Sequence, residues 1–264
     1  MRGTHRMEII SPVEYLKEWL LTVQEYTFLS LQAVANLFRK PLYFADILQQ
    51  ADVIGVGSLP IVLLTGFFTG AVLALNSASS LSQFGATALT GELVSISMIR
   101  ELGPVLTSLM VAGRNASGMA SELGSMKVTE QIDAMRALGT DPTKKLVTPR
   151  VVATVVMLFF LAIISDLLGL LGAWLFTVTM VGIPSAQYWH TTYQNLSFHD
   201  VFMGLLKPFV FGYLIATIGC YYGITTTGGT QGVGRSTTQA MVMSSVLIIA
   251  VDFLITRAVL VLFP

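Results

Sequence analysis

Charged residues are scarce in this chain of 264 residues, of which only 11% are Asp, Glu, Lys or Arg. Soluble domains carry about 25%, whereas 53% of the residues here are hydrophobic. The composition therefore excludes an ordinary soluble domain and predicts an integral membrane protein. Lys plus Arg and Asp plus Glu are equal at 15 each, so no basic excess indicates a nucleic-acid partner, and we expect none.

Cysteine and histidine are too few for several kinds of site. The single Cys220 lies within an apolar run, which excludes a disulfide framework. The three histidines, His5, His190 and His199, lack the spacing of metal ligands. No Ser/His pair or pair of acids has a spacing that indicates catalysis. We therefore expect no metal, no bound cofactor and no enzymatic activity in this chain.

Long apolar segments are what the chain does have. A membrane-spanning helix needs about 20 predominantly apolar residues, and five segments meet this length, at about 53–76, 91–112, 151–183, 201–222 and 237–263. In the third, Gly169 and Ala173 have the spacing that lets helices approach closely. The intervening segments 77–90 and 184–200 are expected to be loops. The predicted fold class is an all-α integral membrane protein with five transmembrane helices.

The segment before the first span has a different pattern. Residues 11–38 are interrupted by charges, and Leu16, Trp19, Leu20 and Val23 share one helical face. This pattern predicts an N-terminal amphipathic helix that lies in the membrane interface. A second short amphipathic piece, 42–52, leads into the first span.

The positive residues predict the orientation. Twelve of the 15 lie outside the spans, and all of them fall before span one, between spans two and three, or between spans four and five. The positive-inside rule then places these segments, and the N-terminus, in the cytoplasm, and the C-terminus on the other side.

Six ionisable residues lie within the predicted spans: Arg100, Glu101, Asp166, Lys207, Asp252 and Arg257. A rise of about 1.5 Å per residue places several of them at overlapping depths, so we predict that Arg100 and Glu101 pair with Lys207 and Asp252. Two interpretations remain open. The charges form buried ion pairs that fix helix register, or they line a polar cavity that meets a lipid headgroup.

A short helix is predicted between spans two and three, after a run of small residues from 112 to 125. Thr129 is the expected N-cap, and Gly139 follows the last helical residue. Ile132, Met135 and Leu138 recur every third residue and form an apolar ridge. Such a ridge is suited to a groove on a partner protein.

Residues 229–236, GTQGVGRS, nearly match the phosphate-binding loop G-x-x-x-x-G-K-[ST], with Arg in place of Lys. A membrane segment precedes them, where that loop requires a buried strand. We therefore expect no nucleotide site in this chain, and any ATP would be bound by another subunit.

Two segments resemble a known family. RELGPVLTSLMVAGRNASGMASELGSMKVTEQIDAM, from Arg100, and GVGRSTTQAMVMSSVLIIAVDFLITRAVL, from Gly232, are similar to the MlaE-type permeases of the Mla/MCE lipid-trafficking ABC transporters. The resemblance covers about residues 40–264. Together with the amphipathic pattern before the first span, it predicts N-terminal cytoplasmic or interfacial helices at 1–52 and a permease domain at 53–264. It implies a multi-pass protein of the bacterial inner membrane, whose C-terminus the positive-inside rule places in the periplasm.

The resemblance also implies partners. They are a second copy of the chain, a cytoplasmic ABC ATPase dimer that uses ATP and Mg, a regulatory STAS-domain subunit and a periplasmic hexamer of MCE-domain proteins. The implied task is to move phospholipid between the inner membrane and the periplasmic carrier or outer membrane. Relatives handle sterols and other lipids.

The family's functional positions map onto this sequence as expectations. The lipid pocket corresponds to Leu73, Leu81, Phe84, Arg100 and Glu101, where Phe84 replaces a frequent tyrosine. The intramembrane charges correspond to Arg100, Glu101, Lys207 and Asp252, to which the depth argument adds Asp166. The helix that couples to the ATPase corresponds to about 127–138, with Lys127, Glu130, Gln131, Ile132, Asp133, Met135 and Leu138.

Other functions remain as alternatives. A proton-coupled secondary carrier would use Glu101, Asp166 or Asp252 as its proton-binding acid. The same ABC architecture could import a sterol or another lipid. A purely structural anchor for a periplasmic ring is a further alternative.

Overall fold

The computed structural model describes residues 12–41 and 43–262. Within these ranges the chain is helical and forms no strand. Five helical segments are long and apolar enough to cross a membrane: Phe44–Ser82, Thr87–Val128, Thr143–Val181, Phe198–Ile224 and Gly229–Val259. The all-α class and the five spans are therefore confirmed. All five begin before the predicted boundaries, because the helices continue through polar sequence beyond their apolar centres.

Three of these segments contain π-helical turns, which are wider than α-helical turns. They are labelled η, and so is η2, which is a 3₁₀ turn. The first consists of α2 (Phe44–Ala51), η1 (Asp52–Val56) and α3 (Gly57–Ser82). The second consists of η2 (Thr87–Leu89), α4 (Thr90–Ser97), η3 (Met98–Leu102), α5 (Gly103–Val111), η4 (Ala112–Ala116) and α6 (Ser117–Val128). The third consists of η5 (Thr143–Val147), α8 (Thr148–Phe176) and η6 (Thr177–Val181). The last two are α10 (Phe198–Ile224) and α11 (Gly229–Leu262). Such turns are rare and occur often at functional sites.

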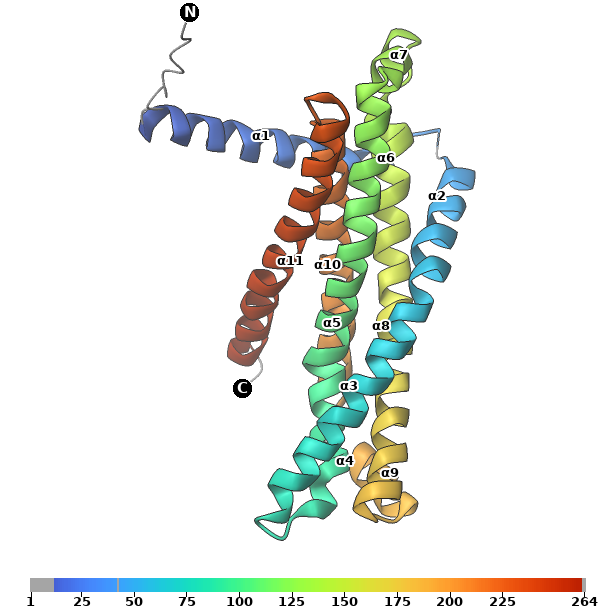
Figure 1. Ribbon diagram of the computed structural model, residues 1–264, viewed down its shortest axis with the longest axis vertical. Coiled ribbons are helices and arrows are strands. Elements are labelled where there is room, and N and C mark those ends of the chain that lie inside the picture. The colour runs from blue at the N-terminus through green and yellow to red at the C-terminus, as the bar shows by residue number, and fades with distance from the viewer. Residues whose placement is uncertain (1–11, 42, 263–264) are drawn as a thin grey trace, which may run out of the picture.

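The long helices run side by side along one axis, and α11 leans away from the others at its C-terminal end (Figure 1). Small residues allow α3 and α8 to approach closely. A side chain at Gly70 would overlap the backbone of Gly169, and one at Gly66 would lie 2.8 Å from the Ser165 carbonyl oxygen. The predicted close approach at Gly169 is therefore confirmed, and backbone contact replaces side-chain packing at this crossing.

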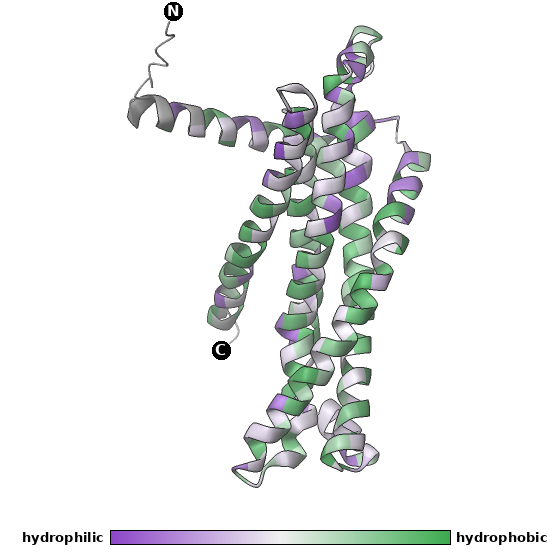
Figure 2. Cartoon of the chain, in the orientation of Figure 1, coloured by the Kyte–Doolittle hydropathy of each residue, from purple (hydrophilic) through white to green (hydrophobic). Residues whose placement is uncertain are grey.

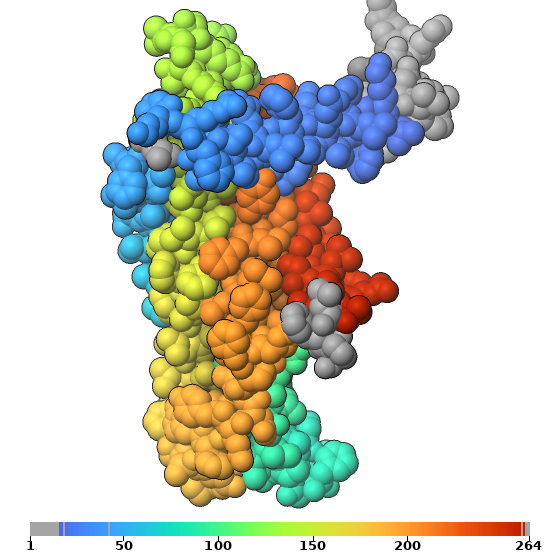
Figure 3. Space-filling model, turned by 180° about the vertical axis from the view of Figure 1, so that it is seen from behind, coloured from blue at the N-terminus to red at the C-terminus, as the bar shows by residue number. Residues whose placement is uncertain are grey.

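Helix α1 (Pro12–Leu37) lies across one end of the bundle, close to perpendicular to it (Figures 1 and 3). Trp19 and Leu20 remain about half exposed, as the amphipathic pattern predicts. On its other side, Tyr26 shares a hydrogen bond of 2.9 Å with Thr217, and Ser30 pairs with Tyr213. The N-terminal helix is thus confirmed, while its position in a membrane interface stays a prediction. Residues 1–11 of the predicted N-terminal segment lie outside the described residues.

The same end of the bundle carries the short helix α7 (Gln131–Ala137), and we call it the α7 end. The opposite α9 end holds the turn after Ser82 and the helix α9 (Ser185–Gln194). The prediction of a loop at 184–200 was wrong. Tyr188 is buried and its hydroxyl donates to the Leu170 carbonyl, while Trp189 stacks on Tyr193. The hydrogen bond of Tyr188, together with the contact of Trp189 with Trp174 at 6.4 Å between ring centroids, holds α9 against α8. Figure 2 shows the apolar residues concentrated along the bundle between the two ends.

Candidate functional site

A cluster of charged residues joins three of the spanning segments. Lys207 of α10 is fully buried, and its ammonium group pairs with Glu101 of η3. The same nitrogen lies 2.8 Å from Oδ1 of Asp252 on α11, an ion-pair contact outside hydrogen-bonding geometry. The Thr256 hydroxyl is 2.9 Å from the Lys207 nitrogen and 3.1 Å from Oε1 of Glu101. The predicted pairing of Lys207 with both acids is therefore confirmed.

Arg100 does not join this cluster. It pairs instead with Asp200 at the start of α10, with 3.4 Å between Nε and Oδ1. Asp200 is fixed by a capping box, in which Ser197 and Asp200 each accept from the other's backbone amide. Because Arg100 and Glu101 are consecutive on a helix, their side chains diverge and take different partners. The prediction that Arg100 pairs within the Lys207 cluster was wrong.

Asp166 also lies outside the cluster. It is buried on α8, and its Oδ1 has no hydrogen-bond partner within residues 12–41 and 43–262. The atom lies against Gly103, where a side chain would overlap it. The prediction that Asp166 belongs to the charge cluster was wrong, because depth along a span does not give the direction in which a side chain points.

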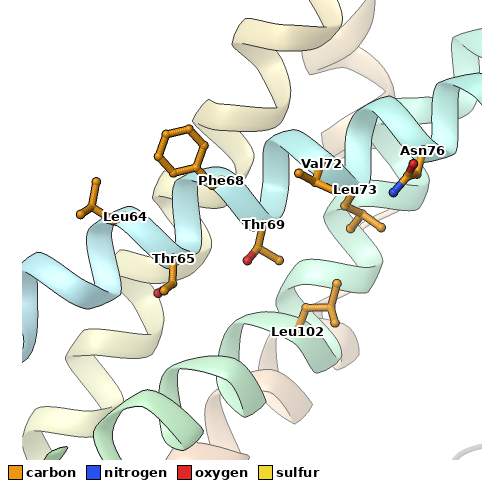
Figure 4. Close-up of a pocket in the computed structure, with 8 residues that line it drawn as sticks. All are labelled: Leu64, Thr65, Phe68, Thr69, Val72, Leu73, Asn76 and Leu102. Atoms are coloured by element: carbon orange, nitrogen blue, oxygen red, sulfur yellow. The ribbon is translucent and has the colours of Figure 1, made fainter.

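An open hollow of about 590 Å³ follows α3 on the side that faces η3. Figure 4 shows Thr65, Thr69 and Leu73 of α3 pointing toward the neighbouring segment that carries Leu102. The complete lining is Leu64, Thr65, Phe68, Thr69, Val72, Leu73, Asn76 and Leu102. It contains no charged residue, so it is suited to apolar chains with few polar contacts.

A second hollow, of about 260 Å³, continues the first toward the α9 end and shares Asn76 with it. Leu81 and Phe84 line this part, and the Phe84 side chain is 82% exposed. Three of the predicted pocket residues, Leu73, Leu81 and Phe84, are therefore brought together along one side of α3. Arg100 and Glu101 do not line either hollow, because they point toward α10.

Helix α7 is joined to α6 by a sharp turn, in which Glu130 adopts a left-handed conformation with φ of 59°. Thr129 does not cap α7 as predicted, because its hydroxyl donates back to the Ser125 carbonyl of α6. Gly139 follows with φ of 77° and ends the helix in the predicted place. The short helix is therefore where the sequence placed it, although the residue that turns the chain is Glu130.

The apolar ridge predicted on α7 is divided between two environments. Ile132 is fully buried in a core with Leu123 and Val147, and Met135 packs against the same core. Only Leu138, 84% exposed, remains free of it. Ile132 is thus unavailable to a partner, contrary to the prediction, because it fastens α7 to α6 and α8. The exposed surface of α7 and its two flanking residues includes the polar Glu130, Gln131, Asp133 and Arg136, and the apolar Ala134, Ala137 and Leu138.

Asp133 gives this surface a fixed charge pattern. Lys127 donates to its carboxylate at 2.8 Å, and Arg136 contacts the other oxygen at 3.3 Å. The hydrogen bond from Lys127 is the main reason that the pKa of Asp133 lies below its usual value. The exposed face of α7 therefore presents an ionised Asp133 between two cations.

Sequence reasoning missed two features, and only the first of them had a signal in the sequence. The sequence Ser197-Phe-His-Asp200 before an apolar run is typical of a helix N-terminus, and it marks Asp200 as part of α10. The π-helical turns had no signal of this kind, since their wide hydrogen bonds depend on packing between helices.

Comparison with known proteins identifies the family. The family described as Permease MlaE matches residues 47–258. A probable ABC transporter permease protein of Rickettsia bellii is 44% identical over 236 residues, which cover 89% of this chain and 91% of its own. The intermembrane phospholipid transport system permease protein MlaE of Haemophilus influenzae is 34% identical over 215 residues, 81% of this chain and 82% of its own.

A plant protein is also similar. The chloroplastic protein TRIGALACTOSYLDIACYLGLYCEROL 1 of Arabidopsis thaliana is 37% identical over 225 residues, 85% of this chain and 64% of its own. The family match begins in α2 and ends in α11, so it contains the Lys207 cluster, both hollows and α7. With this coverage, the chain belongs to the MlaE family of permeases.

Proposed function

We propose that this chain is the permease subunit of an ABC transporter that moves phospholipid, driven by separate ATPase subunits. The observation that carries the proposal is the uncharged, largely apolar hollow on α3, which can accommodate acyl chains. The names of the relatives support it, since they describe ABC transporter permeases and an intermembrane phospholipid transport system.

In this proposal the ATPase subunit binds α7, and its conformational change displaces this helix. The charged face of α7 contains Asp133 and Arg136, next to Lys127 at the end of α6, and its inner face is fastened to the bundle through Ile132. Helix α6 leads from it into the long second span, which carries Leu102 of the hollow. A displacement of α7 would therefore reach the hollow through one continuous helical segment.

The α7 end would then lie in the cytoplasm, and the α9 end in the periplasm of a bacterial inner membrane. The distribution of Lys and Arg supports this orientation. The hollow on α3 is open along one side, and a second copy of the chain would supply the missing wall. A STAS-domain subunit and an MCE-domain hexamer complete the proposed complex, with phospholipid as cargo.

The test is lipid transfer by the complex purified with its ATPase subunits and reconstituted in liposomes. We expect transfer of a fluorescent phospholipid to require ATP and to stop when the ATPase is inactivated. Transfer that proceeds without ATP and follows a proton gradient would contradict the proposal and favour a secondary carrier. Replacing the phospholipid with a sterol in the same assay tests the choice of cargo.

A further inference from the structure

Arg114, in η4 of the second span, reaches across to the first span. Its Nη1 donates to the Val53 carbonyl at 3.1 Å and to the Ser58 hydroxyl at 3.0 Å. The neighbouring Asn115 donates to the same hydroxyl at 3.1 Å. Ser58 is fully buried and Asn115 nearly so. We call Ser58, Arg114 and Asn115 the Arg114 link.

The carbonyl that Arg114 contacts is made available by a π-helical turn. In an α-helix, the amide of residue 57 would donate to the carbonyl of residue 53. Here the Gly57 amide donates instead to Asp52, one residue further back. The Val53 carbonyl therefore lacks its usual partner, and the Arg114 guanidinium takes that place. The contact gives this carbonyl a donor again and so stabilises the turn.

Gly57 leaves the space that the guanidinium occupies. A Cβ at this position would overlap Nη2 of Arg114 and lie 2.7 Å from Nη1. The described residues give Arg114 no acidic partner. Nη1 supplies both hydrogen bonds to the first span while the flat guanidinium lies against Gly57, so the link depends on the shape of arginine as well as its charge, and lysine would not reproduce it.

The Arg114 link is also the hydrogen-bonded connection between the first and the second spanning segment. Among the described residues, its bonds are the only hydrogen bonds between the segment α2–η1–α3 and the segment α4–α6. The first segment carries most of the hollow, and the second leads to α7. We infer that the Arg114 link transmits displacement of α6 and α7 to α3, so that Arg114 is a positioning residue for transport. The inference rests on the proposed function.

The test compares variants in the reconstituted complex by the amount of lipid moved per ATP hydrolysed. Ser58→Ala removes the shared hydroxyl, and Arg114→Lys keeps the charge without the directed donors. We expect both to assemble and hydrolyse ATP, with a ratio about five- to tenfold lower, in the usual range of coupling between sites. Ser117→Ala is the matched control, because its hydroxyl donates only to backbone carbonyls of its own spanning segment, those of Gly113 and Arg114, and makes no bond to the first span.

The outcomes are distinguishable. If Ser58→Ala and Arg114→Lys keep the unaltered ratio, or if hydrolysis and transfer fall together, the inference is overturned and the link is only structural. An equal fall in the ratio for Ser117→Ala would overturn it as well. If Arg114→Lys does not assemble, Ser58→Ala decides alone. Failure of the unaltered complex to couple ATP to transfer would instead contradict the proposed function.

Discussion

Two consecutive residues of η3 belong to opposite kinds of environment. Glu101 is part of the Lys207 cluster, where charges are paired between three spanning segments. Leu102 lines the hollow on α3, which contains no charge. The charges of the cluster are paired with one another, whereas the hollow is open on one side. The difference indicates that the charges fix the helices relative to one another and that the hollow receives the apolar cargo.

This comparison separates the two interpretations that the sequence left open. A polar cavity that meets a headgroup would place Arg100 and Glu101 among the lining residues of the hollow, and they do not line it. Buried ion pairs that fix register require the contacts between Lys207, Glu101 and Asp252, and those are present. The geometry therefore favours the structural interpretation of the cluster.

The largest effect is expected from Lys207→Ala. It leaves Glu101 and Asp252 without their cation, and because these acids are 36% and 20% exposed, the cost should lie below the roughly 3–5 kcal/mol of a fully buried pair. Thermal unfolding of the purified protein would show this as a markedly lower melting temperature. In the triple variant Lys207→Met, Glu101→Gln, Asp252→Asn no charge is left unpaired, so most of the loss should be recovered. A single variant as stable as the unaltered protein would show that the cluster does not hold the helices.

A change in the hollow should affect lipid and not stability. Thr69→Trp places a large side chain in the space between α3 and Leu102. We expect co-purified phospholipid, measured by mass spectrometry, to fall about tenfold, as for about 1.4 kcal/mol of lost affinity. The control is Leu171→Trp on α8, where the side chain is 43% exposed outside the hollow. Equal amounts of co-purified phospholipid in the two variants would contradict the hollow as the binding site.

Replacing Arg100 tests whether it contributes to stability as its sequence neighbour Glu101 does. Its pair with Asp200 is partly exposed, and Asp200 keeps its bonds to Ser197 when Arg100 is replaced. Arg100→Gln should therefore cost about 1 kcal/mol or less, well below Lys207→Ala, in the same thermal unfolding assay. A loss as large as that of Lys207→Ala would place Arg100 in the cluster after all.

The smallest effect is expected at the exposed pair of α7. Lys127 lowers the pKa of Asp133 in the folded protein, so the interaction stabilises α7 above the usual Asp pKa of about 3.9 and is lost as the pH falls through the lowered value. Carbon-detected NMR titration of Asp133 should give a midpoint below 3.9, and Lys127→Gln should raise it. A midpoint that Lys127→Gln leaves unchanged would exclude the pair in solution.

Much of this arrangement follows from sequence, because apolar length and paired charge have direct physical consequences. The five spans, the position of α7 and the contacts of Lys207 with Glu101 and Asp252 could all be predicted. The direction in which the Ile132 side chain points could not be predicted. An apolar ridge on a short helix fits a partner or the protein's own core equally well, and only the packing of α6 and α8 decides.

The contacts of Arg114 also could not be predicted from the sequence. The sequence placed it among cytoplasmic cations that follow the second span, whereas the helix continues through it and turns its guanidinium toward Val53. One of its two acceptors in the first span, the Val53 carbonyl, loses its usual backbone donor because of a π-helical turn. Such a turn is set by the fit between two helices, which the pattern within one helix does not contain.

The central claim is that phospholipid occupies the hollow on α3 and leaves it when ATP is used. A photoreactive amino acid at Thr69, in the reconstituted complex with its ATPase, tests this directly. The account predicts a phospholipid adduct at Thr69 that decreases when ATP is added, while an adduct at Leu171, exposed on α8 outside the hollow, is unchanged. Adducts at the two positions that respond alike to ATP, or no adduct at Thr69, would contradict it.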